Sequence, residues 1–288
     1  MKRVSGSFLV ALTLAASAAG TQAHSNERLA SGLDVALGKV ISADALREGT
    51  RISSAGRYEL DCRSTIGDRV SLTIKLRGRS VLFAYSTNGS ILKGTSYVDV
   101  ACRNVKRQVA KRTDKGYEFA FSGDLLVDDS SSAKVGEVET RVVCLPNMIA
   151  VRTEIEPSLP GTFSISGNNP FRQFFSLSDL EKWAETTLLT QDSRGWYHLN
   201  ELIFSEDFLL ERWGLNAQDL RRIIFGNLDS VLTVTANRDS AVTLNRYGKS
   251  GLSFSVAWRR SEWVERVVPW DKALSYTYSF AIEEGTRL

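Results

Sequence analysis

The strongest constraint on the fold is a two-residue hydrophobic period that runs through residues 56–144. Tyr58, Leu60 and Cys62 alternate with charged residues, and similar alternation recurs over residues 70–76, 98–102 and 138–144. A period of two gives each strand one buried and one solvent-facing side, which is typical of antiparallel sheets. The sequence therefore predicts antiparallel strands that pair into a β-sandwich or a small barrel.

Two local signals in the first half predict a short helix and a hairpin turn. Ser42 and Gly49 flank a segment that can form a short capped helix over residues 42–48. Asn88-Gly89 follows an apolar run, and both residues tolerate the positive φ angles of tight turns. A hairpin turn is therefore expected at residues 87–90.

Composition changes after residue 149 and indicates a domain boundary. Four of the five prolines lie between Pro146 and Pro170, all three cysteines precede residue 150, and all six tryptophans follow it. We predict a β-rich domain over residues 24–155, a linker or long loop over residues 156–175, and a second domain over residues 176–288. One sandwich with a helical insertion is the alternative.

The second domain is expected to be α+β. Capping residues precede possible helices at residues 182–189, 206–213 and 217–225, and glycines follow the last two. Alternating runs between residues 230 and 282 then predict a β-meander. The predicted fold class is therefore β-rich α+β, with an N-terminal antiparallel sandwich or barrel followed by short helices and a meander.

The first 23 residues have the three parts of a secretory signal peptide. Lys2 and Arg3 precede an apolar run over residues 8–20, and Thr21-Gln22-Ala23 has small residues at the cleavage positions. Cleavage after Ala23 would place the protein in the periplasm or outside the cell. A buried N-terminal helix is the alternative. No later apolar run has spanning length, so no transmembrane segment is expected after cleavage.

Charge gives no general argument for nucleic acid as a partner. The formal net charge is +3, and it falls to +1 once Lys2 and Arg3 are removed. The densest basic cluster contains Lys106, Arg107, Lys111 and Arg112. It is a candidate contact for phosphate or lipid head groups, and a solvated hairpin loop is the alternative.

Cysteine spacing fits neither a paired metal site nor a redox motif. In an oxidising compartment one disulfide and one remaining thiol are expected. Cys62 with Cys102 is the predicted pair, because both lie on the inward side of strands in one sheet region, and Cys144 would then be free. Three buried thiols are the alternative.

Few residues are candidates for a chemical site. His198 is the only internal histidine, so acid–base catalysis by imidazole would use it, although no nucleophile motif accompanies it. Trp263 and Trp270 lie among charged residues and could stack on a ligand or simply pack in the core. No cofactor is predicted.

Cleavage after Ala23 would place His24 at the N-terminus, where its amine and imidazole could chelate copper together, with His198 as a third ligand. This arrangement resembles the histidine brace of copper polysaccharide monooxygenases and of some periplasmic copper carriers. The resemblance covers one residue and implies no particular fold.

The sequence favours an exported bacterial binding or envelope-interaction protein without catalytic activity, whose partner is unknown and could be an envelope component or another protein. A periplasmic hydrolase or copper-dependent enzyme that uses His198 or His24 is the first alternative. An outer-membrane β-barrel is the second, because residues 274–282 alternate as such strands do.

Overall fold

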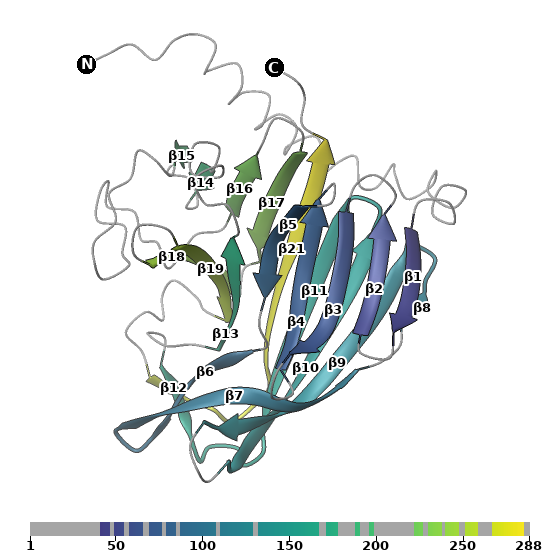
Figure 1. Ribbon diagram of the computed structural model, residues 1–288. Helices are drawn as coiled ribbons and strands as arrows, with labels where there is room; N and C mark the ends of the chain where they lie inside the picture. Colours follow the sequence, from purple (N-terminus) through teal and green to yellow (C-terminus); the bar gives the residue numbers. More distant parts are fainter. Residues whose placement is uncertain are drawn as a thin grey trace, which may run out of the picture.

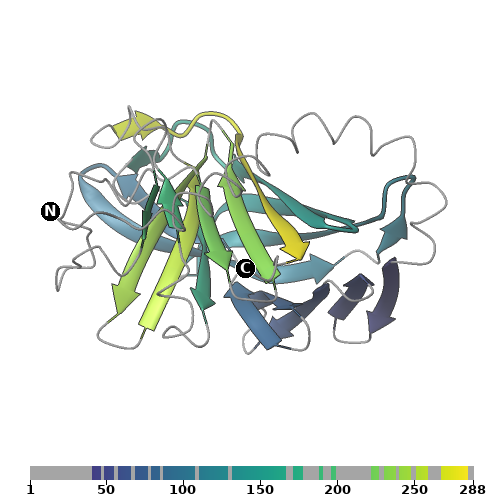
Figure 2. The ribbon, with the colours of Figure 1, turned by 90° about the horizontal axis from the view of Figure 1, so that it is seen from above.

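The computed structural model describes residues 41–46, 49–54, 58–65, 69–76, 79–84, 87–107, 110–128, 132–166, 171–177, 188–190, 196–198, 222–226, 230–237, 240–247, 251–258 and 267–284. All twenty-one strands of this part are antiparallel to their neighbours and belong to one large curled sheet that folds into two facing layers (Figures 1 and 2). The described part of the chain contains no helix.

The first run of paired strands forms one layer. It begins at the sheet edge with β1 and continues through neighbouring strands in the order β1 (Ile41–Leu46), β2 (Gly49–Ser54), β3 (Tyr58–Thr65), β4 (Arg69–Leu76), β5 (Arg79–Ala84), β13 (Arg172–Leu177), β19 (Gly251–Trp258) and β18 (Ser240–Tyr247). Strands that are adjacent in the sequence thus form its first part, and strands from beyond residue 170 extend it.

The second run forms the opposite layer. Its strands follow the order β7 (Ser96–Arg107), β9 (Tyr117–Val127), β10 (Lys134–Leu145), β11 (Met148–Pro157), β21 (Leu274–Glu284), β17 (Ser230–Ala236), β16 (Arg222–Gly226), β14 (Leu188–Thr190) and β15 (Trp196–His198). The two-residue strand β8 (Lys111–Arg112) also pairs with β9.

A small arm of strands extends from β7. β6 (Asn88–Lys93) pairs with β7 on one side and with β12 (Ser164–Ser166) on the other, and β12 pairs with β20 (Val267–Pro269). β6 also meets β13 at one residue pair, Arg172 with Asn88. The arm therefore connects the two runs of strands, and it lies at the lower left of Figure 1.

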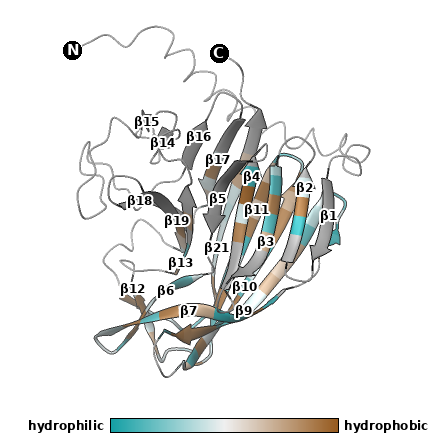
Figure 3. Cartoon of the chain, in the orientation of Figure 1, coloured by the Kyte–Doolittle hydropathy of each residue, from teal (hydrophilic) through white to brown (hydrophobic). Residues whose placement is uncertain are grey.

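The core lies between the two layers and is built from alternate residues of the facing strands. Buried residues of β3 and β4, such as Leu60 and Ile74, belong to one cluster with Val142, Val151 and Phe280 of the second run. The alternation of apolar and polar residues is visible along β3, β4 and β11 in Figure 3. The period of two thus predicts correctly which side of these strands is buried.

A buried polar network joins the two layers inside this core. The Gln173 amide on β13 donates to the hydroxyls of Thr87 and Thr153, at 3.3 Å each, and accepts a hydrogen bond from the Tyr278 hydroxyl. Thr153 in turn lies 3.1 Å from the Thr140 hydroxyl. All five side chains are buried, so these bonds replace water at the centre of the sandwich.

The predicted helices are wrong wherever the structure describes them. Residues 42–46 lie in β1, residues 188–189 lie in β14, and residues 222–225 lie in β16. The segment 206–213 is outside the described residues. Capping residues favour a helix only locally and weakly, and pairing with a neighbouring strand overrides that preference here. The mainly-β part of the predicted fold class is confirmed, and the α+β part is not.

The predicted hairpin turn at Asn88-Gly89 is also wrong. Both residues lie inside β6, opposite Ala101 and Val100 of β7. The turn between β6 and β7 falls at Gly94, whose φ of 64° is a conformation that glycine adopts at little cost.

Strand pairing crosses the predicted linker at residues 156–175. β11 pairs with β21, β5 pairs with β13, and β12 itself lies within the segment predicted as a linker. Strands of both predicted domains therefore share one sheet. The sequence does not reveal this pairing, because the partners are more than 90 residues apart in the chain.

The predicted Cys62–Cys102 disulfide is absent, and all three cysteines are buried thiols. Cys62 lies on β3 between β2 and β4, whereas Cys102 lies on β7 between β6 and β9. Both cysteines lie on the buried side of their strands, but β3 and β7 are not neighbours in the sheet. Burial raises the pKa of the Cys102 thiol to about 12 and raises the pKa of Cys144 as well.

Candidate functional site

The outer face of β9, β10 and β11 carries a cluster of charged side chains. On β10, Val138 and Thr140 point into the core, so Glu139 and Arg141 point away from it. β11 alternates in the same way and directs Arg152 outward. The outward side chains form what we call the charged face: Asp124, Glu137, Glu139, Arg141, Arg152, Glu154 and Glu156.

The register between β10 and β11 places like charges directly opposite each other. Glu137 faces Glu156, Glu139 faces Glu154, and Arg141 faces Arg152. The order Glu-x-Glu-x-Arg on β10 is thus mirrored by Arg-x-Glu-x-Glu on β11. Directly opposed side chains are about 5 Å apart at Cβ, and like charges at that distance destabilise a sheet. These opposed like charges by themselves weaken the pairing of β10 with β11.

Ion pairs along each strand offset part of this repulsion. The Arg141 Nε lies 2.6 Å from the Glu139 carboxylate, and Arg152 pairs with Glu154 on the neighbouring strand. Both arginine side chains are 59% exposed, and the four residues line a hollow of about 170 Å³. A row of two carboxylates therefore lies beside a row of two guanidinium groups, with two residues, or about 7 Å, between the rows.

A second cluster surrounds Asp124 on the neighbouring strand β9. The Lys134 ammonium lies 2.7 Å from Asp124 and 2.5 Å from Glu137, and the Asn104 amide donates to Asp124 at 3.0 Å. Both donors come from irregular strand positions. Asn104 has a φ of 52° within a register shift of β7, and Lys134 precedes a register shift of β10. These bulges redirect the two donors toward Asp124.

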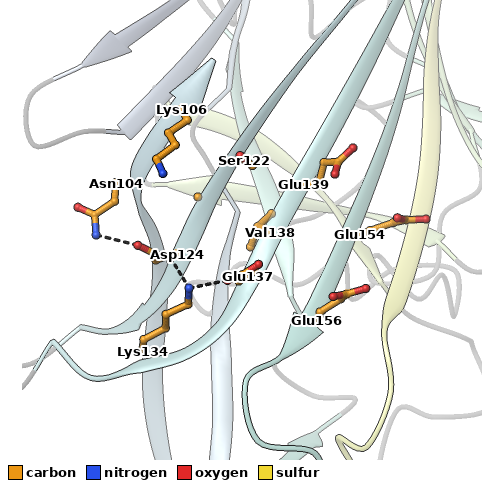
Figure 4. Close-up of a pocket in the computed structure, with 11 residues that line it drawn as sticks. Asn104, Lys106, Ser122, Asp124, Lys134, Glu137, Val138, Glu139, Glu154 and Glu156 are labelled. Carbon is orange, nitrogen blue, oxygen red and sulfur yellow. Dashed lines mark hydrogen bonds and ion pairs between the residues drawn. The ribbon is translucent and has the colours of Figure 1, made fainter. Parts of the chain in front are cut away.

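A shallow hollow of about 300 Å³ lies beside Asp124 (Figure 4). Its walls include the outward glutamates of β10 and β11, Glu137, Glu139, Glu154 and Glu156. Hydrogen bonds from Lys134 and Asn104 hold the pKa of the Asp124 carboxyl below its usual range, and the charge of Lys106 adds to this effect. The carboxylate is therefore ionised at neutral pH and accepts hydrogen bonds. The lining residues are Asn104, Lys106, Ser122, Gly123, Asp124, Lys134, Glu137, Val138, Glu139, Glu154 and Glu156.

This surface presents charged groups at fixed positions that a charged ligand could contact. Its opposed pairs form two acidic rows and one basic row, and its hollows are open to solvent. Among the described residues, no group of three or more histidine, cysteine or carboxylate side chains is arranged to hold a metal ion. In the same part of the chain, no helix is long and apolar enough to cross a membrane.

The structure divides the predicted basic cluster between two places. Lys106 lines the larger hollow. Lys111 and Arg112 are exposed on β8, opposite Glu118 and Tyr117 of β9, and Arg107 lies at the end of β7 opposite Phe121. The basic cluster thus flanks the charged face on the side of β9.

Of the other predicted site residues, the structure describes Trp270 and His198. Trp270 is 1% exposed and packs against Phe171, with ring centroids 5.1 Å apart, so it belongs to the core as the alternative interpretation held. His198 ends the short strand β15, where it pairs with Leu188 of β14. His24 and Trp263 are outside the described residues.

Sequence reasoning missed the glutamates and arginines of the charged face. The motifs Glu137-x-Glu-x-Arg141 and Arg152-x-Glu-x-Glu156 are readable in the sequence as solvent-facing positions of two strands. Their mirror relationship becomes apparent only when the two strands are placed in register. A search for like charges opposed across a short hairpin would have found them.

Comparisons with known proteins give the fold only. No protein-family model matches the chain, and no curated protein matches it. The Slr1438 protein of Synechocystis sp. PCC 6803 is similar over 83% of this chain and 98% of its own, with a TM-score of 0.51 and 9% identity. A galactose mutarotase-like protein from Lactobacillus casei ATCC 334 matches 84% of this chain and all of its own, with a TM-score of 0.45 and 8% identity.

A galactose 1-epimerase from Lactobacillus acidophilus NCFM matches 80% of this chain and 95% of its own, with a TM-score of 0.42 and 9% identity. At these identities the similarity indicates architecture alone. The described part of the chain is a mainly-β fold whose large curled antiparallel sheet resembles the galactose mutarotase-like β-sandwich.

Proposed function

We propose that this chain is an exported binding protein without catalytic activity, and that it holds a partner through the charged face of β9–β11. The observation that carries the proposal is the direct opposition of like charges in the pairs Glu139–Glu154 and Arg141–Arg152. A sheet has no structural need for such rows, because opposite charges across the strands would stabilise it more. A partner with complementary charges relieves the repulsion within both rows when it binds.

The spacing of the rows defines the chemistry of the partner. Its cationic group would lie over Glu139 and Glu154, and its anionic group would lie over Arg141 and Arg152, about 7 Å away. An extended polypeptide with charges of opposite sign two residues apart has this spacing. The proposed partner is therefore a protein segment of that pattern in the cell envelope.

A charge-swapped variant tests the proposal. In it Glu139 and Glu154 become Arg, while Arg141 and Arg152 become Glu, so that net charge and the ion pairs along each strand are kept but the two rows exchange sign. The wild-type protein should retain a partner from an envelope extract at low salt and release it as salt rises. The swapped variant should fold with an unchanged Tm and lose that partner.

A control variant with Lys111→Glu and Arg112→Glu changes exposed charges of β8 outside the charged face, and it should keep the partner. Identical partner sets for the wild-type and swapped proteins would contradict the proposal. Export is tested separately by the intact mass of protein recovered from cells, which should begin at His24. Loss of an activity in His198→Ala at unchanged stability would instead support the enzyme hypothesis.

A further inference from the structure

The arm of β7, β6, β12 and β20 carries an exposed aromatic ring that the charged face does not use. Tyr97 lies near the start of β7 and is 55% exposed, yet its hydroxyl donates to the Ser166 hydroxyl on β12 at 3.1 Å. β6 lies between these two strands. The side chain therefore extends across β6 and is held at both ends, by its own backbone and by Ser166.

The residues beneath the ring show how it lies. Ile91, Val98 and Ile165 of the arm face the core, so Leu92 and Ser90 of β6 face outward. Both outward side chains are nonetheless buried, at 6% and 1% exposure. Tyr97 stands directly opposite Leu92 of β6, and its hydroxyl reaches Ser166 on the next strand, β12. The Tyr97 side chain thus crosses β6 to reach β12, and more than half of its surface is open to solvent.

A carboxylate lies beside this ring. Asp99 follows Tyr97 by two residues on the same side of β7 and lies opposite Ser90 of β6. On β12, Ser166 follows Ile165, which pairs with Ile91 of β6. The Ser90 hydroxyl donates to the Asp99 carboxylate at 2.5 Å and holds it in place. Asp99 is exposed, and the structure gives it no ion-pair partner among the described residues. Val267 of β20, 57% exposed, lies opposite Ser166.

We propose that Tyr97 and Asp99 form a binding site for a guanidinium group, carried by an arginine side chain of a partner. A guanidinium is planar and weakly hydrated, so it stacks on an aromatic ring, and its N–H groups donate in pairs to a carboxylate. The exposed Tyr97 ring supplies the stacking surface, and Asp99, two residues along the same side of β7, supplies the negative charge. Val267 adds apolar contact for the aliphatic part of the partner. This site does not depend on the charged face.

The experiment uses the full chain and three short peptides, Ac-Gly-X-Gly-NH2, in which X is arginine, lysine or citrulline. Citrulline has the shape of arginine and keeps its planar group, but it is uncharged. Binding is followed by the NMR resonances of the Tyr97 ring. The arginine peptide should shift these resonances, the lysine peptide should bind several-fold more weakly because it cannot stack as a plane, and the citrulline peptide about tenfold more weakly.

Protein variants give the second arm of the test. Asp99→Asn should weaken arginine binding about tenfold and abolish the preference for arginine over citrulline. Tyr97→Leu should abolish binding, as followed by the amide resonances of β6 and β7. Asp114→Asn removes an exposed carboxylate elsewhere and should change nothing. Equal binding of the arginine and citrulline peptides, or no shift with the arginine peptide, would overturn the proposal. The peptide comparison leaves the protein unchanged, so it remains decisive if Tyr97→Leu does not fold.

Discussion

Single residues in this protein are constrained mainly by how closely strands approach one another. Gly136 lies at the register shift between β9 and β10, beneath the edge of Trp270. A Cβ atom at this position would lie 2.5 Å from the Glu156 carbonyl oxygen and 2.7 Å from the Trp270 ring. Gly136 is thus required by the packing of a core tryptophan, which the sequence does not show.

The variant Gly136→Ala should therefore lower the free energy of unfolding by about 1–3 kcal/mol, because the Glu156 backbone and the Trp270 ring would both have to move. Urea denaturation measures this difference. Glu137→Ala, at the next residue, removes an exposed side chain and should cost less than about 1 kcal/mol. Equal stability of Gly136→Ala and the wild type would show that the strands are farther apart than described.

At the scale of elements, the choice of partner strands decides what each segment becomes. Ser42 and Gly49 would suit a short helix, but residues 41–46 pair fully with β2 as a strand. A local preference of a few tenths of a kcal/mol per residue is smaller than the hydrogen bonds and side-chain contacts of a strand pair. Helix prediction fails here because the competing interaction comes from another segment.

The polar network around Gln173 should be as important as apolar packing for joining the two layers. Gln173→Leu removes both donors and the acceptor at once, leaving the Tyr278 hydroxyl and two threonine hydroxyls buried without this partner. We expect a loss of stability on the order of 3 kcal/mol, measured by chemical denaturation.

A double-mutant cycle with Tyr278→Phe checks the origin of this loss. The double variant should be more stable than the sum of the two single effects predicts, because Tyr278→Phe removes a hydroxyl that Gln173→Leu leaves unsatisfied. Additive effects would mean that the two side chains do not share a hydrogen bond.

At the scale of the whole molecule, burial of titratable groups makes the protein sensitive to alkaline pH. Burial raises the pKa values of Cys102, Cys144, Tyr58, Tyr276 and Tyr278, that of Cys102 to about 12. Above a pH of about 8.5 a thiol ionises in the unfolded chain but stays protonated in the folded one. The unfolded state then binds fewer protons, so the free energy of unfolding falls as pH rises.

We therefore expect stability to be nearly constant between about pH 6 and 8, and then to decline by about 1.4 kcal/mol per pH unit for each such thiol. For Cys102 the decline ends as pH passes its folded pKa of about 12. Thermal unfolding at a series of pH values measures the slope. Cys102→Val should make it shallower, and a pH-independent Tm up to pH 11 would contradict buried thiols.

The sequence alone determined β3, β4, β7 and β10 as strands and the side of each that is buried, because a two-residue period follows directly from the geometry of a strand. Only the tertiary structure decided that β5 pairs with β13 and that β11 pairs with β21, since pairing energies between distant segments leave no local pattern. The same register placed Glu139 opposite Glu154 and Tyr97 beside Ser166. Both candidate binding sites therefore arise from strand register, which depends on the whole sheet and not on any one segment.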